Sequence, residues 1–277
     1  MKFLKFSQPT SAILKSILFC LVFIALLVAF STLKSFISVK YERLAHGIIG
    51  TVVALLSTYL FIRFDKKSFS DIGLKFEKST LKKFFAGILI GIVLMGLPAI
   101  CVIYFSGFKI EVNENSSTLN FLFLTLPLIL LSFMEEVAFR GYPLTILKEK
   151  TGIRISILIT SILFALYHLA NGWTIANSFL GAGVWGIVFG LSAIYSNGIS
   201  MPTGLHYAAN LTTSAFGITS NSFNIWVLKQ QDGGSLENFH TSQLTTLIPQ
   251  ICLLILGIVC MELFIRSNKL SGMKASH

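Results

Sequence analysis

Residues 119–141 read LNFLFLTLPLILLSFMEEVAFRG, an apolar run that ends in two adjacent carboxylates and an arginine. A helix that crosses a bilayer needs about 20 mostly apolar residues, and this run has that length. Each charge at the centre of a membrane helix costs about 2.5–3.5 kcal/mol of insertion free energy. Glu135, Glu136 and Arg140 would therefore destabilise insertion of this helix unless they are paired. The run therefore predicts a transmembrane helix with ionisable side chains near one end.

The composition of the whole chain is typical of a membrane protein. Of the 277 residues, 54% are apolar and 12% are charged, and the mean hydropathy is +0.77. An average soluble domain is roughly 45–50% apolar and about 25% charged. So few charges cannot cover the surface of a soluble domain of this length. The composition thus excludes a soluble enzyme, a disordered protein and a secreted disulfide scaffold.

The same length criterion finds eight segments that could cross a bilayer. They lie near residues 14–33, 45–63, 84–105, 119–139, 155–170, 175–196, 202–218 and 245–265. We therefore expect an all-α fold, a polytopic transmembrane helical bundle of about eight helices.

The basic residues indicate how such a bundle lies in the membrane. The 22 Lys and Arg side chains give a formal net charge of +10 and stand almost entirely between the apolar segments. This distribution is typical of the positive-inside rule and of attraction to anionic lipid, and we expect no nucleic-acid partner. Eight spans place both termini on the cytoplasmic side of the cell membrane. The connection with Lys34, Lys40 and Arg43 conflicts with this orientation, because it falls on the opposite side.

Small residues recur at the spacing that lets membrane helices approach closely. Gly87 and Gly91 are four positions apart, as are Gly186 and Gly190. The GxxxG spacing is common at helix contacts in lipid, so we interpret both pairs as packing residues.

The two carboxylates at the end of the 119–141 run differ in their partners along the helix. Glu136 and Arg140 are four positions apart, so that one helical face can pair them. Glu135 has no such partner on its own helix and is available as a general base or acid. The alternative is a helix end at which these charges simply reach water, and Arg140 with Gly141, Tyr142 and Pro143 does resemble a helix boundary.

Two histidines and an asparagine lie in other apolar segments. His168 ends the stretch Phe164–His168, where a lone histidine is more often a packed or interfacial residue. His206 and Asn210 are four positions apart in a short apolar segment that begins near Pro202, so they share a helical face. With Glu135 they supply the base, the orienting partner and the oxyanion donors that hydrolysis by water requires.

The three motifs together resemble the CPBP intramembrane proteases, which are relatives of the CAAX prenyl endopeptidase and of bacterial Abi and bacteriocin self-immunity proteins. They are EExxxR at Glu135–Arg140, FxxxH at Phe164–His168 and HxxxN at His206–Asn210. The resemblance covers roughly residues 119–215, and Asp71–Leu74 is a weaker upstream likeness.

The resemblance divides the chain into three parts. Residues 1–118 would hold N-terminal transmembrane helices and a basic cytoplasmic loop, and residues 119–218 a CPBP-like catalytic core. Residues 219–277 would hold an exposed polar loop near 221–241 with Gly233 and Gly234, a last transmembrane helix and a basic tail.

The resemblance also implies a role for each motif residue. Glu135 would be the catalytic carboxylate, and His168 would help to activate the attacking water. His206 and Asn210 would stabilise the oxyanion. Glu136, paired with Arg140, would hold the helix and tune Glu135. The implied activity is an intramembrane endopeptidase that cuts a membrane-associated peptide or protein, in CAAX-type processing or in a role related to bacteriocin immunity.

The cofactor stays open at this point. The chain could be a metal-free glutamate endopeptidase, or a metalloendopeptidase with a single divalent metal such as zinc. In the second case Glu135, His168 and His206 would supply three ligands and water the fourth, as in catalytic zinc sites.

Two other functions are compatible with the sequence. A non-catalytic membrane scaffold or immunity protein would keep the fold but not the chemistry. A proton-coupled transporter would use the intramembrane acid and histidine residues as a relay. A simple eight-helix topology also places His168 and His206 toward opposite membrane faces, so the protease hypothesis requires tilted, short or partly re-entrant helices.

Overall fold

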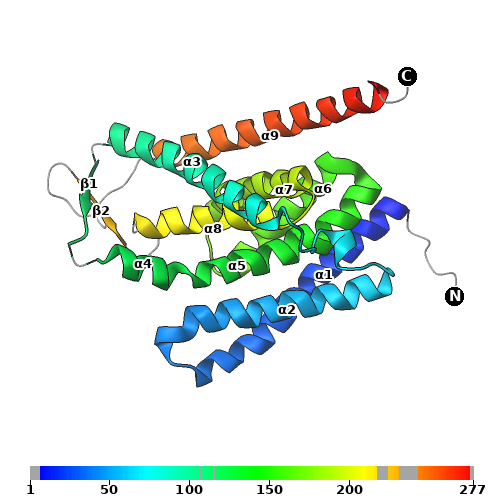
Figure 1. The fold of residues 1–277 in the computed structure, drawn as a ribbon, viewed down its shortest axis with the longest axis horizontal. Coiled ribbons are helices and arrows are strands. Elements are labelled where there is room, and N and C mark those ends of the chain that lie inside the picture. Colours follow the sequence, from blue (N-terminus) through cyan, green and yellow to red (C-terminus); the bar gives the residue numbers. More distant parts are fainter. Residues whose placement is uncertain (1–6, 107, 115, 217–223, 231–242, 275–277) are drawn as a thin grey trace.

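The computed structural model describes residues 7–106, 108–114, 116–216, 224–230 and 243–274. These residues form a bundle of helices with a two-stranded sheet at one end (Figure 1). In chain order the elements are α1 (Gln8–Ser31), α2 (Glu42–Phe64), α3 (Thr80–Ser106), β1 (Phe108–Val112), α4 (Thr118–Thr125), α5 (Pro127–Glu136), α6 (Tyr142–Ala170), α7 (Val184–Ser196), α8 (Ser200–Ala215), β2 (Trp226–Gln230) and α9 (Gln243–Lys274).

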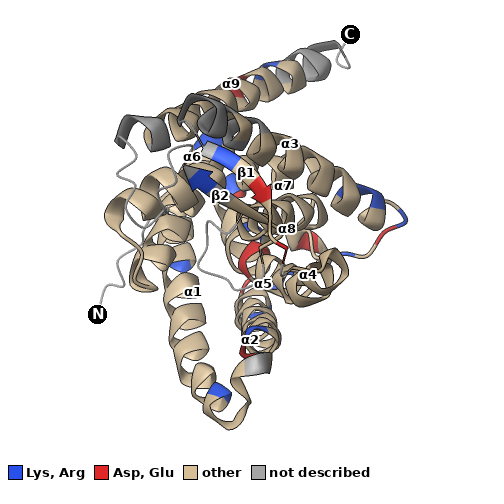
Figure 2. Cartoon of the chain, turned by 90° about the vertical axis from the view of Figure 1, so that its left-hand side faces the viewer, with Lys and Arg blue, Asp and Glu red and all other residues tan. Residues whose placement is uncertain are grey.

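The predicted all-α class is confirmed, and the protein is a multi-pass membrane protein. Within the described ranges, each segment predicted to cross the bilayer coincides largely with helix. Within the described ranges, five helical segments are long and apolar enough to cross a membrane: Gln8–Phe36, Glu42–Phe64, Thr118–Ala170, Asn177–Ser196 and Leu247–Asn268. Lys, Arg, Asp and Glu are sparse along the helices, as a view from the sheet end shows (Figure 2). The expected number of about eight spans stays a prediction.

The polar loop expected near residues 221–241 is partly wrong. Its first half contains β2, which pairs antiparallel with β1, so that Phe108 lies opposite Gln230 and Val112 opposite Trp226. Each strand has only five residues, and more than a hundred positions separate the two. The local sequence pattern therefore does not predict that these strands pair. Gly233 and Gly234 lie outside the described residues.

The connection between α2 and α3 folds back onto the turn between α7 and α8. Ile72 is buried in this connection, and Gly73 adopts φ +78°. A Cβ on Gly73 would lie 2.9 Å from the Cα of Gly198, and the Gly73 carbonyl accepts from the Ile199 amide at 3.3 Å. The Ser68 backbone amide and hydroxyl both donate to Asp71 and hold the pKa of that carboxyl below its usual range. The upstream likeness at Asp71–Leu74 is thus an anchored turn that fixes the start of α8.

Close backbone contact between α3 and α8 positions the rest of α8. A Cβ on Gly87 would lie 2.1 Å from the Met201 carbonyl oxygen, and one on Gly204 would lie 2.0 Å from the Phe84 carbonyl oxygen. Gly91 lies in the same contact, against Leu205 and Ala208.

Gly186 and Gly190 on α7 pack in the same way against Ser161 and Ile157 on α6. The interpretation of the two GxxxG pairs as packing residues is therefore confirmed.

We expect Gly87→Ala to destabilise the protein, because its methyl group would overlap the backbone of α8. Overpacking typically costs about 1–3 kcal/mol, which thermal unfolding in detergent can detect. Gly96→Ala is the matched control on the same helix, since nothing lies within 4 Å of its added Cβ. Gly96→Ala should unfold at the wild-type temperature or slightly above it. Equal stability of the two variants would contradict the close contact of α3 with α8.

Candidate active site

Glu135 and Glu136 are the last two residues of α5, and a π-helical turn over Val137–Gly141 follows them directly. All five residues of this turn are buried, including Arg140. π-Helical turns are rare, and many of them occur at functional sites. The wider turn carries the chain from α5 into α6 while Arg140 stays within reach of Glu136.

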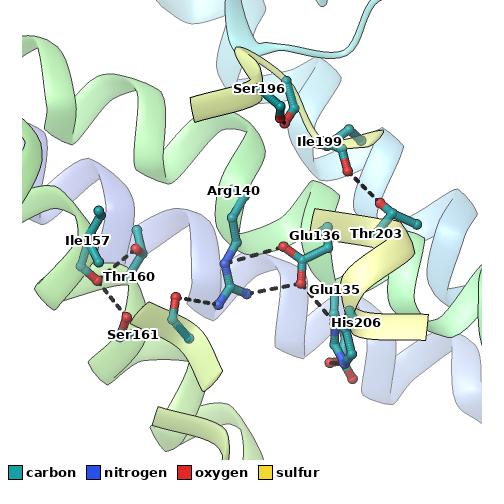
Figure 3. Close-up of polar contacts among 12 residues, drawn as sticks. Glu135, Glu136, Arg140, Ile157, Thr160, Ser161, Ser196, Ile199, Thr203 and His206 are labelled. Carbon is teal, nitrogen blue, oxygen red and sulfur yellow. Dashed lines mark hydrogen bonds and ion pairs between the residues drawn. The ribbon is translucent and has the colours of Figure 1, made fainter. Parts of the chain in front are cut away.

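The predicted ion pair between Glu136 and Arg140 is present, and both side chains are fully buried. Arg140 Nε lies 3.4 Å from Glu136 Oε2, and Nη1 donates to Oε1 at 3.5 Å (Figure 3). Arg140 Nη2 also donates to the Gly186 carbonyl on α7 at 3.2 Å. The guanidinium carbon lies 4.4 Å from the ring centroid of Phe164 and 5.3 Å from that of Phe189, so aromatic rings partner the buried charge.

His206 lies between the two carboxylates. Its Nδ1 is 2.8 Å from Glu136 Oε1, and its Nε2 is 3.5 Å from Glu135 Oε2 (Figure 3). The imidazole stacks on Phe189 with ring centroids 4.4 Å apart and planes 17° apart. Glu135, which has no partner on its own helix, thus has one on α8.

Asn210 extends the contact between α8 and α5. Its side-chain amide donates to Ser132 Oγ at 3.4 Å, one turn before Glu136 on α5. Ser132 is fully buried and was not among the predicted site residues. Its signal in the sequence is weak, because a lone serine in an apolar run is common in membrane helices.

His168 stands at the edge of this site. Its Nδ1 is 2.9 Å from the Phe164 carbonyl oxygen, and its ring contacts those of Phe164 and Trp173 at centroid distances of 4.5 and 4.6 Å. In the part of the chain that the structure describes, no hydrogen bond or ion pair joins His168 to Glu135 or His206. Phe164 connects the two histidines instead, since its ring also lies 5.9 Å from that of His206.

This arrangement resolves most of the difficulty that a simple eight-helix topology places His168 and His206 toward opposite membrane faces. Phe164, one turn before His168, meets His206, the seventh residue of the short helix α8. His168 therefore lies about one helical turn, or about 5.4 Å along α6, from the level of His206.

The residues do not form a metal site as they stand. The described residues contain no group of three or more His, Cys, Asp or Glu side chains that could hold a metal ion. Of the three donors implied by the resemblance, Glu135 and His206 face each other, while His168 makes no hydrogen bond or ion pair to either within the described ranges. In this arrangement the three side chains do not form the donor set of a zinc site.

The helical membrane bundle thus brings together carboxylate, imidazole and amide groups, the kinds of group that hydrolysis by water uses. Residues 117–212 match the family described as type II CAAX prenyl endopeptidase Rce1-like. This match supports the predicted membership of the CPBP family over the matched segment, and a protease in general. All six predicted site residues lie inside the matched segment. No curated protein matches the chain.

Glu136→Ala should destabilise the protein, because it leaves the Arg140 guanidinium buried without a carboxylate. Breaking a buried pair from one side costs about 3–5 kcal/mol, so we expect lower yield and a lower unfolding temperature in detergent. Glu135→Ala is the control on the adjacent residue. The Glu135 side chain is 15% exposed, and its one ion pair among the described residues is the 3.5 Å contact to His206, so this variant should be about as stable as wild type. The ion pair is not structural if both variants keep wild-type stability.

Proposed function

We propose that the protein is an intramembrane endopeptidase that hydrolyses a peptide bond of a membrane-associated substrate, with water activated by Glu135. The observation that carries this proposal is the environment of Glu135. Its Oε2 is buried and accepts no hydrogen bond among the described residues, although the side chain is 15% exposed. A carboxylate oxygen without a donor, next to an imidazole, can take a proton from an incoming water molecule.

The neighbouring residues have distinct roles in this reaction. His168 helps to orient the attacking water from the end of α6. Asn210 donates to the oxyanion that forms when water attacks the carbonyl carbon, and His206 donates to it from the same face of α8. Donors held in place before the reaction are worth most in a site that excludes water.

The substrate proposed here is a membrane-anchored peptide of the CAAX type. The Rce1-like match supports this class, because its description names a CAAX prenyl endopeptidase. We further propose that both termini face the cytoplasm. The first turns of α1 and the last turns of α9 lie at the same end of the bundle (Figure 1), which supports a common side for both termini.

Glu135→Gln should abolish proteolysis without unfolding the protein. The amide keeps the shape of the side chain but cannot take a proton from water, so turnover should fall by about 10²–10⁴-fold. The assay uses purified protein in bilayers with a library of prenylated and unprenylated peptides. Binding of a labelled peptide, measured in parallel, should survive the change. Proteolysis retained in Glu135→Gln would assign the base to another residue, and Glu136 is the next candidate.

Chelation should leave the activity unchanged, because the described residues gather no three-ligand set for a metal. Purified protein is dialysed against a strong chelator and assayed on the same peptides, with elemental analysis of both samples. A soluble zinc protease serves as the positive control for chelation. Activity lost on chelation and restored by zinc would require a rearranged site in which His168 joins Glu135 and His206.

A further inference from the structure

A small cavity lies where the first turns of α6, the end of α7 and the anchored turn at Gly73 meet. Its volume is about 40 Å³. One water molecule needs about 10–15 Å³ of such space, so the cavity has room for roughly three waters or for one group of similar size. Arg140 lines its buried end, and the exposed residue Lys148 lines its outer end. The cavity therefore extends from the surface to the arginine of the buried ion pair.

Three polar side chains in the lining of this cavity have unused hydrogen-bond donors. Lys148 and Thr145 from α6, and Asn197 directly after α7, make no side-chain hydrogen bond or ion pair to another described residue. A lysine carries three donors and no acceptor, and a hydroxyl and a side-chain amide carry donors as well. Donors from two helices thus border one small space.

The charges in the lining favour a negatively charged occupant. Arg140 and Lys148 are cations, and Asp71 is the one carboxylate among the lining residues. Asp71 Oδ2 already accepts from the backbone amide and the hydroxyl of Ser68 within its own turn. Arg140 has Glu136 as its counter-ion, whereas Lys148 has none in the described ranges. A bound anion would supply the charge that Lys148 lacks.

The cavity lies at an end of the bundle that is rich in basic side chains. Lys150, two residues after Lys148, donates to Gln8, the first residue of α1. The start of α1 lies at the end of the bundle away from the two-stranded sheet (Figure 1). The connection from α2 to α3, which lines the cavity at Asp71–Gly73, also carries Lys66, Lys67, Lys75 and Lys78. Basic side chains next to membrane helices attract the phosphate-bearing headgroups of anionic lipids.

We propose that this cavity binds a phosphate group, which Lys148 holds from the outer end and Thr145 and Asn197 hold by neutral hydrogen bonds. Lysine binds phosphate as a point charge, and the neutral donors fix its orientation. The phosphate belongs either to the headgroup of an anionic lipid or to free inorganic phosphate, which present similar oxygens. The proposal does not rest on peptide hydrolysis, because none of these three donors takes part in the proposed reaction. Bound phosphate joins α6 to the end of α7 and so stabilises the bundle.

Thermal unfolding of the purified full-length chain in a neutral detergent measures this binding. A ligand that binds only the folded state raises the unfolding temperature. One arm titrates inorganic phosphate and compares it with chloride at equal ionic strength. The other arm compares phosphatidylglycerol with diacylglycerol of the same acyl chains, which lacks the phosphate. We expect a rise in at least one arm, and that arm identifies the source of the phosphate. No rise in either arm would overturn the proposal.

Three variants test whether the binding occurs in this cavity. Lys148→Gln should weaken it at least about tenfold, the usual loss when a hydrogen bond to a charged group is removed. Thr145→Leu keeps the net charge but fills the cavity, so it should abolish binding. Lys150→Gln is the matched control, because it removes the same charge from the same helix while Lys150 does not line the cavity. Its affinity for phosphate should stay near that of the wild type.

Each variant is compared with its own unfolding temperature in the absence of phosphate, which separates binding from a change in stability. Both lysines are exposed, so their variants decide the test even if Thr145→Leu does not fold. Equal weakening in Lys148→Gln and Lys150→Gln would mean diffuse attraction to a basic surface and would overturn the proposal. Binding that Lys148→Gln and Thr145→Leu leave intact would overturn it as well.

Discussion

The buried ion pair of Glu136 and Arg140 is the interaction on which the rest of the site depends. It joins α5 to the π-helical turn, reaches α7 through the Gly186 carbonyl, and reaches α8 through His206. Charges with no exposed surface are tolerated only if partners replace their hydration. Two aromatic rings beside the guanidinium and one imidazole beside the carboxylate supply those partners. The need to compensate the Glu136 and Arg140 charges thus brings α5, the π-helical turn, α7 and α8 together around this ion pair.

Close packing of small residues determines where His206 can lie. Gly204, two residues before it, rests on the backbone of α3, and Gly87 rests on the backbone of α8. With the anchored turn at Gly73 and Gly198, these contacts fix the position of α8 along its axis and its rotation about that axis. Packing rather than hydrophobic burial drives helix association in lipid, so glycine contacts between helices help to place the His206 imidazole 2.8 Å from Glu136 Oε1.

The sequence predicts the fold class well because an apolar run long enough to cross a bilayer is a strong local signal. It also predicts the pairing of Glu136 with Arg140, since four positions along a helix place two side chains together. Partners on different helices carry no such signal. The contact of Glu135 with His206, the turn at Gly73 and the pairing of β1 with β2 each depend on packing between segments far apart in the chain. The π-helical turn was not predicted either, because its extra residue does not change the apolar pattern of the sequence.

Helix geometry explains why two adjacent carboxylates can do different work. Successive residues on an α-helix point about 100° apart, because one turn takes 3.6 residues. Glu136 consequently faces Arg140 with no exposed surface, while its neighbour Glu135 faces away and keeps 15% of its side chain exposed. His206 can touch both only because it approaches from a third helix and presents one ring nitrogen to each. The doubled glutamate therefore combines a fully buried, ion-paired carboxylate and a partly exposed one in a single turn, and the imidazole of His206 contacts both.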